Sequence, residues 1–231
     1  MRLILVRHGQ TDSNVIHALD TEAPGADLTE LGRRQAEALV AELGEEDIES
    51  MWVSNLVRTH QTAAPLAGAL GLTPIEREGL REIRAGDLEM ANGDAEVRTY
   101  LEGIMAWTVD PDSRMPGAET GREVKERYDA VVAEIVATGQ ETAMIVSHGA
   151  VIVSWAASTV EVPREFLGRS ISNTGVVIIE GDPTDGWQLV RWESRALGGP
   201  SVSDVEHDGP AGYPDERHPD SLGVAGRAAE D

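Results

Sequence analysis

The chain has 231 residues, of which 41% are hydrophobic and none is cysteine, so it can bury one sizeable core and excludes disulfides, thiol catalysis and thiolate metal sites. A formal net charge of −22 argues against nucleic acid and anionic membranes as partners. There is no apolar run of about 18 residues, and the apolar run at the start is too short for a signal peptide, so we expect no membrane span and a cytoplasmic location.

Strand-like and helix-like segments alternate over residues 1–195, an order typical of a parallel sheet covered by helices. Short apolar runs predict strands at 2–7, 50–54 and 142–147, and two more strands around a turn within 174–193. Apolar residues at helical spacing predict helices at 29–44, 56–71, 122–139 and 150–158. Pro65 is expected to kink or restart the second helix. The predicted fold is α/β, a three-layer α/β/α arrangement around a mostly parallel, doubly wound sheet.

The composition changes after Arg195. Residues 196–231 hold six Gly, four Pro, eight Asp or Glu and two Arg, with few large apolar residues. Such a segment buries too little apolar surface to offset the conformational entropy that ordering costs. The sequence therefore predicts one domain at 1–195, followed by an acidic, disordered C-terminal tail at 196–231.

Two fragments, LVRHGQTDSN at 5–14 and IVSHGAV at 145–151, each lead from a predicted strand directly into His-Gly. Ligands of open parallel α/β sheets bind outside the carboxyl ends of the strands, where His8 and His148 are expected. The glycine after each histidine lets a ligand or another backbone approach closely, and the helix start that follows favours an anion. The alternative is that each histidine only caps its strand. The repetition, with Arg7 beside one histidine, favours an anion-binding crevice.

Two further fragments contain charged residues near strand ends. Arg58, in SNLVRTHQTA at 54–63, lies in the first turns of a predicted helix, and Glu82, in LREIRAGDLE at 80–89, lies between an apolar run and a loop. Taken singly, each is typical of a solvated surface. Taken in order, RHGQTDSN, SNLVRTHQTA, LREIRAGDLE and VSHG resemble the motifs of the histidine phosphatase superfamily, in its phosphoglycerate mutase-like branch. The resemblance covers about residues 1–195 and implies a phosphoglycerate mutase-like fold.

This resemblance implies a role for each matching residue. His8 matches the nucleophile that becomes phosphorylated, and His148 matches the second histidine, which hydrogen-bonds the transferring group. Arg7 and Arg58 match the arginines that bind the phosphoryl oxygens. Glu82 matches the acid that protonates the leaving oxygen. Imidazole attacks only when it is neutral, and two neighbouring guanidinium groups disfavour its protonation.

Two more matches concern phosphate binding. Thr11 and Asn14 match positions that add hydrogen bonds to the phosphate. The resemblance also implies no metal and no cofactor, since cationic and donor groups can stabilise the charge of phosphoryl transfer in place of Mg²⁺. A metal site built on two histidines is the alternative, and the lack of a carboxylate motif beside them disfavours it.

The sequence departs from the family pattern in two of the motifs. Thr59 stands where the pattern has alanine, and we expect it to change packing only. Met90 stands where the pattern has glycine, and we expect the loop beyond it to follow a different path. Residues 90–118 occupy the place where family members build a substrate lid, and the arginines of this region are outnumbered by its acidic residues.

The leading hypothesis is a phosphatase that hydrolyses a small phosphomonoester through a phosphohistidine. A phosphoglycerate mutase using the same phosphohistidine is the alternative, and a non-catalytic phosphate-binding protein is a more distant one. An acidic lid is poorly suited to retaining a bisphosphorylated intermediate, which favours hydrolysis. The expected partner is a small phosphorylated metabolite, and the oligomeric state stays open, with a homodimer among the options.

Overall fold

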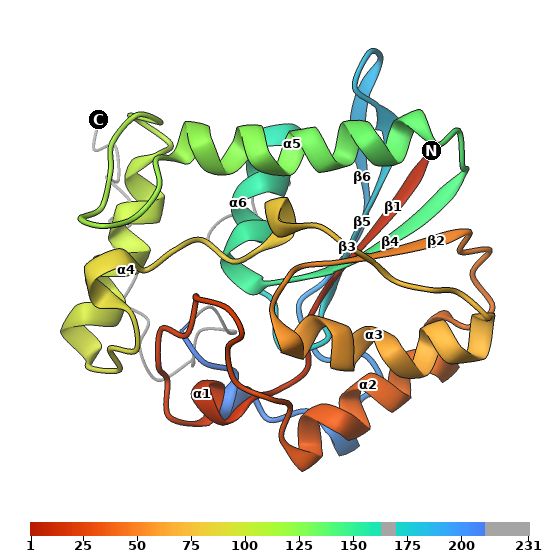
Figure 1. The fold of residues 1–231 in the computed structure, drawn as a ribbon, viewed down its shortest axis with the longest axis horizontal. Helices are drawn as coiled ribbons and strands as arrows, with labels where there is room; N and C mark the ends of the chain where they lie inside the picture. The colour runs from red at the N-terminus through yellow and green to blue at the C-terminus, as the bar shows by residue number, and fades with distance from the viewer. Residues whose placement is uncertain (163–169, 211–231) are drawn as a thin grey trace, which may run out of the picture.

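A computed structural model describes residues 1–162 and 170–210. Its centre is a six-stranded sheet in the order β3-β2-β4-β1-β5-β6 (Figure 1). The strands are β1 (Arg2–Arg7), β2 (Ser50–Val53), β3 (Ile75–Glu76), β4 (Thr142–Ser147), β5 (Val176–Asp182) and β6 (Gly186–Glu193). The first four run parallel, whereas β5 pairs antiparallel with both β1 and β6. The carboxyl ends of β1, β2 and β4 therefore meet at one edge of the sheet.

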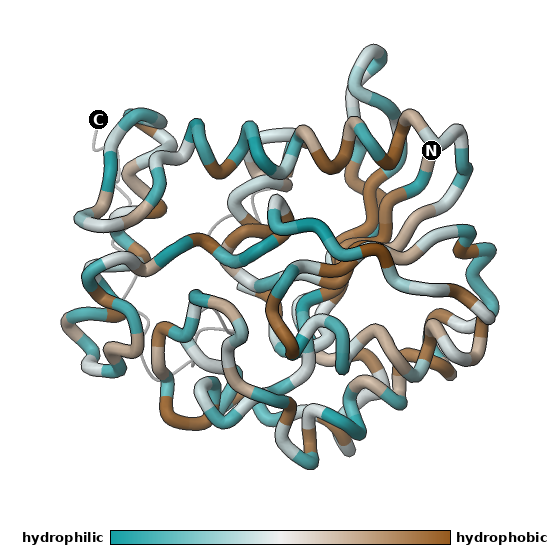
Figure 2. Tube along the Cα trace, in the orientation of Figure 1, coloured by the Kyte–Doolittle hydropathy of each residue, from teal (hydrophilic) through white to brown (hydrophobic). Residues whose placement is uncertain are grey.

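Helices cover both faces of this sheet, which confirms the predicted three-layer α/β/α fold (Figure 1). The covering helices are α2 (Glu30–Leu43) and α3 (Val57–Leu70) on one face and α5 (Gly121–Ala137) and α6 (Gly149–Thr159) on the other. Side chains of a strand alternate between faces, so Leu3 and Leu5 of β1 pack toward α5 and α6. Ile4 and Val6 pack toward α2 and α3. Figure 2 shows the hydrophobic strands gathered between these two helical layers.

The predicted helices begin and end close to their sequence signals. Thr29 caps α2 by accepting a hydrogen bond from the backbone N of Gly32, and Thr120 caps α5. The helix α3 runs unbroken through Pro65, so the expectation that Pro65 would restart it is wrong. Its neighbours Ala63 and Leu66 are buried in the core on the α2 side of the sheet, and this packing holds the helix together across the missing backbone donor.

Some elements were not predicted. They are α1 (Asp12–Val15), α4 (Asp94–Ala106), strand β3, and the 3₁₀ turns η1 (Glu78–Leu80), η2 (Gly86–Leu88), η4 (Pro200–Val202) and η5 (Val205–His207). Several are too short to show a periodic pattern. No helix within 1–162 and 170–210 has the length and apolar character needed to cross a bilayer.

The expectation of a disordered tail from residue 196 is wrong for residues 196–210. Leu197 is buried in the core beside α2, and Val202 and Asp208 are also buried. Nε2 of Gln35, on α2, donates to the backbone O of Val202 over 2.8 Å. Hydrogen bonds to the domain thus supplement the small apolar surface of this segment. The rest of the predicted tail, 211–231, lies outside the described residues.

Candidate active site

His8 follows the last residue of β1 and is almost fully buried. Its Nδ1 lies 2.7 Å from the backbone O of Gly9. A carbonyl oxygen only accepts hydrogen bonds, so Nδ1 carries the ring proton. The lone pair of a neutral His8 ring is therefore on Nε2.

The glycine after His8 allows a close approach between two backbones. A Cβ on Gly9 would lie 2.7 Å from the backbone O of Gly32, in the first turn of α2. A Cβ on Gly32 would in turn lie 2.1 Å from the backbone O of Gln10. The end of β1 and the start of α2 therefore fit together only without side chains at these two positions. This contact sets where the chain turns immediately after His8.

Two buried guanidinium groups lie near His8. Arg7 donates from Nη1 to the backbone O of Ile171 over 2.6 Å, and Arg58 donates from Nη2 to the backbone O of Asp20 over 2.8 Å. Burial, followed by the charges of Arg58 and Arg7, holds the pKa of His8 well below its usual range. His8 is therefore neutral at pH 7, as nucleophilic attack requires.

His148 follows β4 and faces His8, with the two ring centroids 5.2 Å apart. Burial and then the charge of Arg58 hold the pKa of His148 well below its usual range. Nε of Arg58 donates to Nδ1 of His148 over 3.3 Å. The neutral ring then carries its proton on Nε2, which donates to Oγ of Ser54 over 2.7 Å.

A short chain of hydroxyl groups continues from this ring. Oγ of Ser54 accepts from His148 and from the backbone N of Leu56, so the Ser54 proton points to Oγ1 of Thr59, 3.2 Å away. The Thr59 hydroxyl donates to the backbone O of Leu56 over 2.8 Å. The expectation that Thr59 changes packing only is therefore wrong, because it accepts the proton that fixes the direction of this chain.

The side chain of Glu82 contacts the N-terminus of α6, the helix that begins directly after His148. Its Oε1 accepts from the backbone N of Ile83 and of Val151, over 2.8 and 2.9 Å, and its Oε2 accepts from the backbone N of Ala150 over 3.1 Å. The helix dipole adds to this attraction. Burial lowers the pKa of Arg7 and of Arg58, and the negative charge of Glu82 is among the charges that oppose this effect. Glu82 thus belongs electrostatically to the same site.

An ion-pair cluster holds the loop that carries Glu82. Arg127, on α5, donates to the backbone O of Gly79, Arg81 and Glu82 over 2.7, 2.8 and 3.1 Å. Oε1 of Glu119 accepts from Nε of Arg127 over 2.8 Å and from Nη2 of Arg81 over 2.6 Å. Glu119 directly follows the 90–118 segment. Its bonds to Arg81 and Arg127 therefore join the end of that segment to the loop that carries Glu82.

Thr11 and Asn14 are buried at the first turn after the His-Gly motif. Each accepts a hydrogen bond from the backbone N of the other, which forms a capping box on α1. Nδ2 of Asn173 donates to Oδ1 of Asn14 over 3.2 Å and to the backbone O of His8 over 3.0 Å. Asn173 therefore ties α1 to the strand end that carries His8.

The backbone at Met90 and the two arginines are the features of the 90–118 segment that bear on its expected role. Met90 has a φ of 61°, so its backbone takes the left-handed conformation that glycine adopts without strain. Arg114 pairs with Glu123, on α5, over 2.5 Å. Arg98 is exposed on α4 and has no ion pair among the described residues. Of the two arginines of this segment, Arg114 is thus engaged by a carboxylate, and Arg98 is the one without a carboxylate partner among the described residues.

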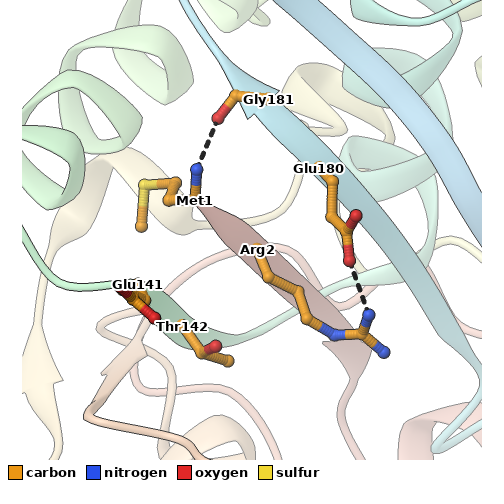
Figure 3. Close-up of a pocket in the computed structure, with 6 residues that line it drawn as sticks. All are labelled: Met1, Arg2, Glu141, Thr142, Glu180 and Gly181. Atoms are coloured by element: carbon orange, nitrogen blue, oxygen red, sulfur yellow. Dashed lines mark hydrogen bonds and ion pairs between the residues drawn. The ribbon is translucent and has the colours of Figure 1, made fainter.

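A surface hollow lies at the opposite edge of the sheet from His8 (Figure 3). Its lining residues are Met1, Arg2, Glu141, Thr142, Glu180 and Gly181. The N-terminal amine donates to the backbone O of Gly181 over 2.8 Å, and Arg2 donates to Glu180 over 2.7 Å. These pairs engage the N-terminal amine, Arg2 and Glu180, and none of the predicted site residues lines the hollow.

The structure thus brings the two histidines, the two arginines and Glu82 to one edge of the sheet, with Asn14 linked to His8. The family model of the histidine phosphatase superfamily (branch 1) matches residues 3–195. The chain belongs to the histidine phosphatase superfamily. This match confirms the family and the phosphatase chemistry that the motifs implied.

Relatives in this superfamily include mycobacterial phosphatases. Glucosyl-3-phosphoglycerate phosphatase of Mycobacterium tuberculosis is 33% identical over 176 residues, covering 70% of this chain and 76% of that protein. A solved structure of the mycobacterial glucosyl-3-phosphoglycerate phosphatase with VO3 is 30% identical, with a TM-score of 0.71, and covers 84% of this chain and 98% of the other. A PE-PGRS family protein of the same species is 36% identical over 217 residues, covering 85% of this chain. The chain spans only 37% of that relative's length.

Sequence reasoning missed several residues at the site of this histidine phosphatase. Ser54 and Asn173 are small polar residues without charge, and only their hydrogen bonds reveal them. Ser54 does stand in the same motif as Arg58, four residues before it, so its place at a strand end was a usable signal. Asp208 gave no signal, because it lies in the segment that the composition marks as disordered.

Proposed function

We propose that Nε2 of His8 attacks a small phosphomonoester and forms a phosphohistidine, which water then hydrolyses. The observation that carries this proposal is the hydrogen bond from Nδ1 of His8 to the backbone O of Gly9, which leaves the lone pair on Nε2. The lowered pKa of the ring, caused by burial and by the two arginines, keeps that lone pair available at neutral pH.

In the first step, Nε2 of His8 forms a bond to phosphorus while the bond from phosphorus to the ester oxygen breaks. Arg7 and Arg58 stabilise the charge on the equatorial oxygens. When Nε of Arg58 turns from Nδ1 of His148 to the phosphoryl group, the ring proton moves to Nδ1 and is donated to the transferring group, while Nε2 accepts from the Ser54 hydroxyl. Glu82 enters this step as a carboxylic acid, gives its proton to the leaving oxygen and becomes a carboxylate. In the second step, water attacks phosphorus, its proton passes to Glu82, and Nε2 recovers its lone pair.

The geometry of Glu82 limits where that proton can sit. Its Oε1 already accepts two backbone N–H groups, whereas Oε2 accepts one. A carboxylate oxygen has two lone pairs, so Oε2 keeps one for a proton. We therefore assign the proton transfer to Oε2 of Glu82.

We also propose that Thr11 and Asn14 contribute to phosphate binding, and that residues 90–118 form the substrate lid. In this segment Arg114 is paired with Glu123, and Asp112 is paired with Arg122. The remaining acidic groups repel a second phosphate or carboxylate. Hydrolysis is therefore favoured over retention of a bisphosphorylated intermediate by a mutase, and the reaction proceeds without a metal at a cytoplasmic location.

The first experiment traps the intermediate. Wild-type protein incubated with a radiolabelled phosphomonoester should carry an acid-labile phosphoryl group, and His8→Ala should neither carry it nor turn over. His60 is half-buried and contacts Glu76, which is not among the site residues, so His60→Ala is the matched control and should behave as wild type. Turnover in His8→Ala equal to that of the control would refute the role of His8.

A second experiment separates hydrolysis from mutation. Phosphate release is measured beside conversion of 3- to 2-phosphoglycerate, with and without 2,3-bisphosphoglycerate. We expect release to exceed conversion and the bisphosphate to have no stimulating effect. Fast bisphosphate-dependent conversion with little phosphate release would make the protein a mutase. The same assays after exhaustive chelation test metal independence, and restoration of lost activity by added Mg²⁺ or Zn²⁺ would contradict it.

A further inference from the structure

The segment after β6 passes along the site edge of the sheet. Gly198 packs against α2, where a Cβ would lie 2.6 Å from Cβ of Ala38. Farther on, Nε2 of Gln10 donates to Oδ2 of Asp204 over 3.1 Å. Gly209 reaches α1, where a Cβ would lie 2.6 Å from Nδ2 of Asn14. We call residues 204–209 the C-terminal strap. The strap contacts Gln10 and Asn14, which lie on either side of Thr11 in the RHGQTDSN motif.

Asp208 is the centre of the strap and is 2% exposed. Its backbone O accepts a hydrogen bond from Nη2 of Arg7. Nη1 of Arg7 donates to the backbone O of Ile171. A guanidinium group is planar and rigid, so two carbonyl acceptors on its two terminal nitrogens fix its plane. One of these two acceptors comes from the strap.

The carboxylate of Asp208 makes a second link. Its Oδ1 accepts from the backbone N of Asn173 over 3.2 Å. The side chain of Asn173 in turn donates to the backbone O of His8 and to Oδ1 of Asn14. One strap residue is therefore bonded to Arg7 directly and to His8 and Asn14 through a single intermediate. The negative charge of Asp208 also acts on Arg7, where it partly offsets the effect of burial on the arginine's pKa.

We propose that Asp208 is a positioning residue of the phosphate site: its carbonyl orients the guanidinium of Arg7, and its carboxylate holds Asn173 beneath His8 and Asn14. The strap is then part of the site that binds the phosphoryl group. This inference rests on the proposed function, in which Arg7 binds phosphate. It predicts that removal of the strap weakens phosphate binding. A strap that blocked the site would give the opposite result.

The decisive comparison uses two truncated proteins. One ends at Ser203 and lacks the strap, and the matched control ends at Pro210 and keeps it. Binding of inorganic phosphate and of orthovanadate is measured by calorimetry, together with KM and kcat on a chromogenic phosphomonoester. We expect the Ser203 truncation to raise Kd and KM by roughly 10- to 100-fold, as for loss of a buried hydrogen bond to a charged group. The control should stay within about threefold of the full chain.

Two substitutions keep the test independent of truncation. Asp208→Asn retains an oxygen that can accept from Asn173, whereas Asp208→Ala does not. Positioning predicts a raised Kd for phosphate in Asp208→Ala and recovery to within about threefold of wild type in Asp208→Asn. Thermal unfolding of every variant identifies any that lose fold, and Kd is compared only among the folded ones.

The outcomes separate this inference from the proposed function. No phosphomonoester turnover by the full chain would refute the proposed function. Turnover by the full chain, with equal phosphate affinity in the two truncated proteins, would refute the strap's role alone. Tighter phosphate binding after loss of the strap would make it an inhibitory segment. Equal losses in both truncations would assign the effect to residues 211–231 and overturn the proposal.

Discussion

Replacing Thr59 by valine would test the hydroxyl chain that orients His148. Valine has nearly the same shape as threonine but cannot accept the proton of Ser54 or donate to the backbone O of Leu56. The remaining acceptor for the Ser54 proton is Nε2 of His148, 2.7 Å away. If the Ser54 hydroxyl turns to that atom, the ring proton must move to Nδ1, which faces the Nε–H group of Arg58.

The expected cost follows from these contacts. The lost hydrogen bond to Leu56 contributes about 0.5–1.5 kcal/mol. Either the Ser54 proton stays unpaired, or two donors, on His148 and Arg58, face each other, and each arrangement costs about 1–3 kcal/mol. Thr59→Val should therefore lower the free energy of unfolding by about 2–4 kcal/mol. Thr59→Ser, which keeps the hydroxyl, should lose less than about 1 kcal/mol.

Two measurements check this reasoning. Denaturant unfolding gives the free energies, and nitrogen-15 NMR of the His148 ring reports which nitrogen carries the proton. We expect the proton on Nε2 in wild type and in Thr59→Ser, and on Nδ1 in any Thr59→Val protein that turns the Ser54 hydroxyl. A Thr59→Val protein as stable as wild type, with the proton still on Nε2, would refute the hydroxyl chain.

Three further predictions concern other parts of the molecule. Glu82→Gln should slow hydrolysis of alkyl phosphates by roughly 10²–10⁴-fold and that of aryl phosphates much less, because aryl leaving groups need less protonation; equal losses would remove Glu82 from the acid role. Met90→Gly should raise the free energy of unfolding by about 0–1 kcal/mol. The left-handed backbone costs methionine about 1–2 kcal/mol, and the greater conformational entropy of glycine in the unfolded chain offsets part of the gain. Thermal unfolding measures the change, and a decrease of more than about 1 kcal/mol would contradict strain at Met90. In the folded state, the pKa values of His8 and His148 lie below the unfolded value of about 6.5. Below that pH the unfolded state therefore binds more protons than the folded state. The free energy of unfolding should fall as the pH drops below about 6.5, by up to about 1.4 kcal/mol per pH unit for each ring. His8→Asn should remove its share of that slope in denaturant unfolding at pH 5 to 8, and an unchanged slope would show that His8 is not held neutral.

The sequence predicts the layers of this fold well because they depend on local patterns. Short continuous apolar runs identify β1 and β4, and the Thr29 cap identifies the start of α2. The motifs likewise predict which residues meet at the strand ends, because strands that run parallel bring their carboxyl ends to one edge. His8 and His148 could therefore be paired although they are far apart in the chain.

The parts that could not be predicted depend on contacts between distant residues. Composition describes residues 196–210 as too polar to fold, and the burial of Asp208 depends on donors supplied by Arg7 and Asn173. Thr59 looks like a neutral replacement until Ser54 is seen beside it. Neither Asp208 nor Thr59 belongs to a recognisable sequence pattern, and the role of each is visible only from the residue that it bonds to in the fold.

The two ends of the 90–118 segment are fastened to the body of the protein. At the start, the backbone N of Met90 donates to the backbone O of Leu19 over 2.9 Å. At the finish, the backbone N of Asp87 donates to the backbone O of Pro116 over 3.0 Å, and Glu119 binds Arg127. Between these ends, the hydroxyl of Tyr100 donates to the backbone O of Ile83 over 2.8 Å, so insertions or deletions that keep this contact should leave the spacing of Glu82 and His148 unchanged. If residues 90–118 form the proposed substrate lid, a change in the length of this segment would alter its contacts with the substrate and leave the catalytic groups in place.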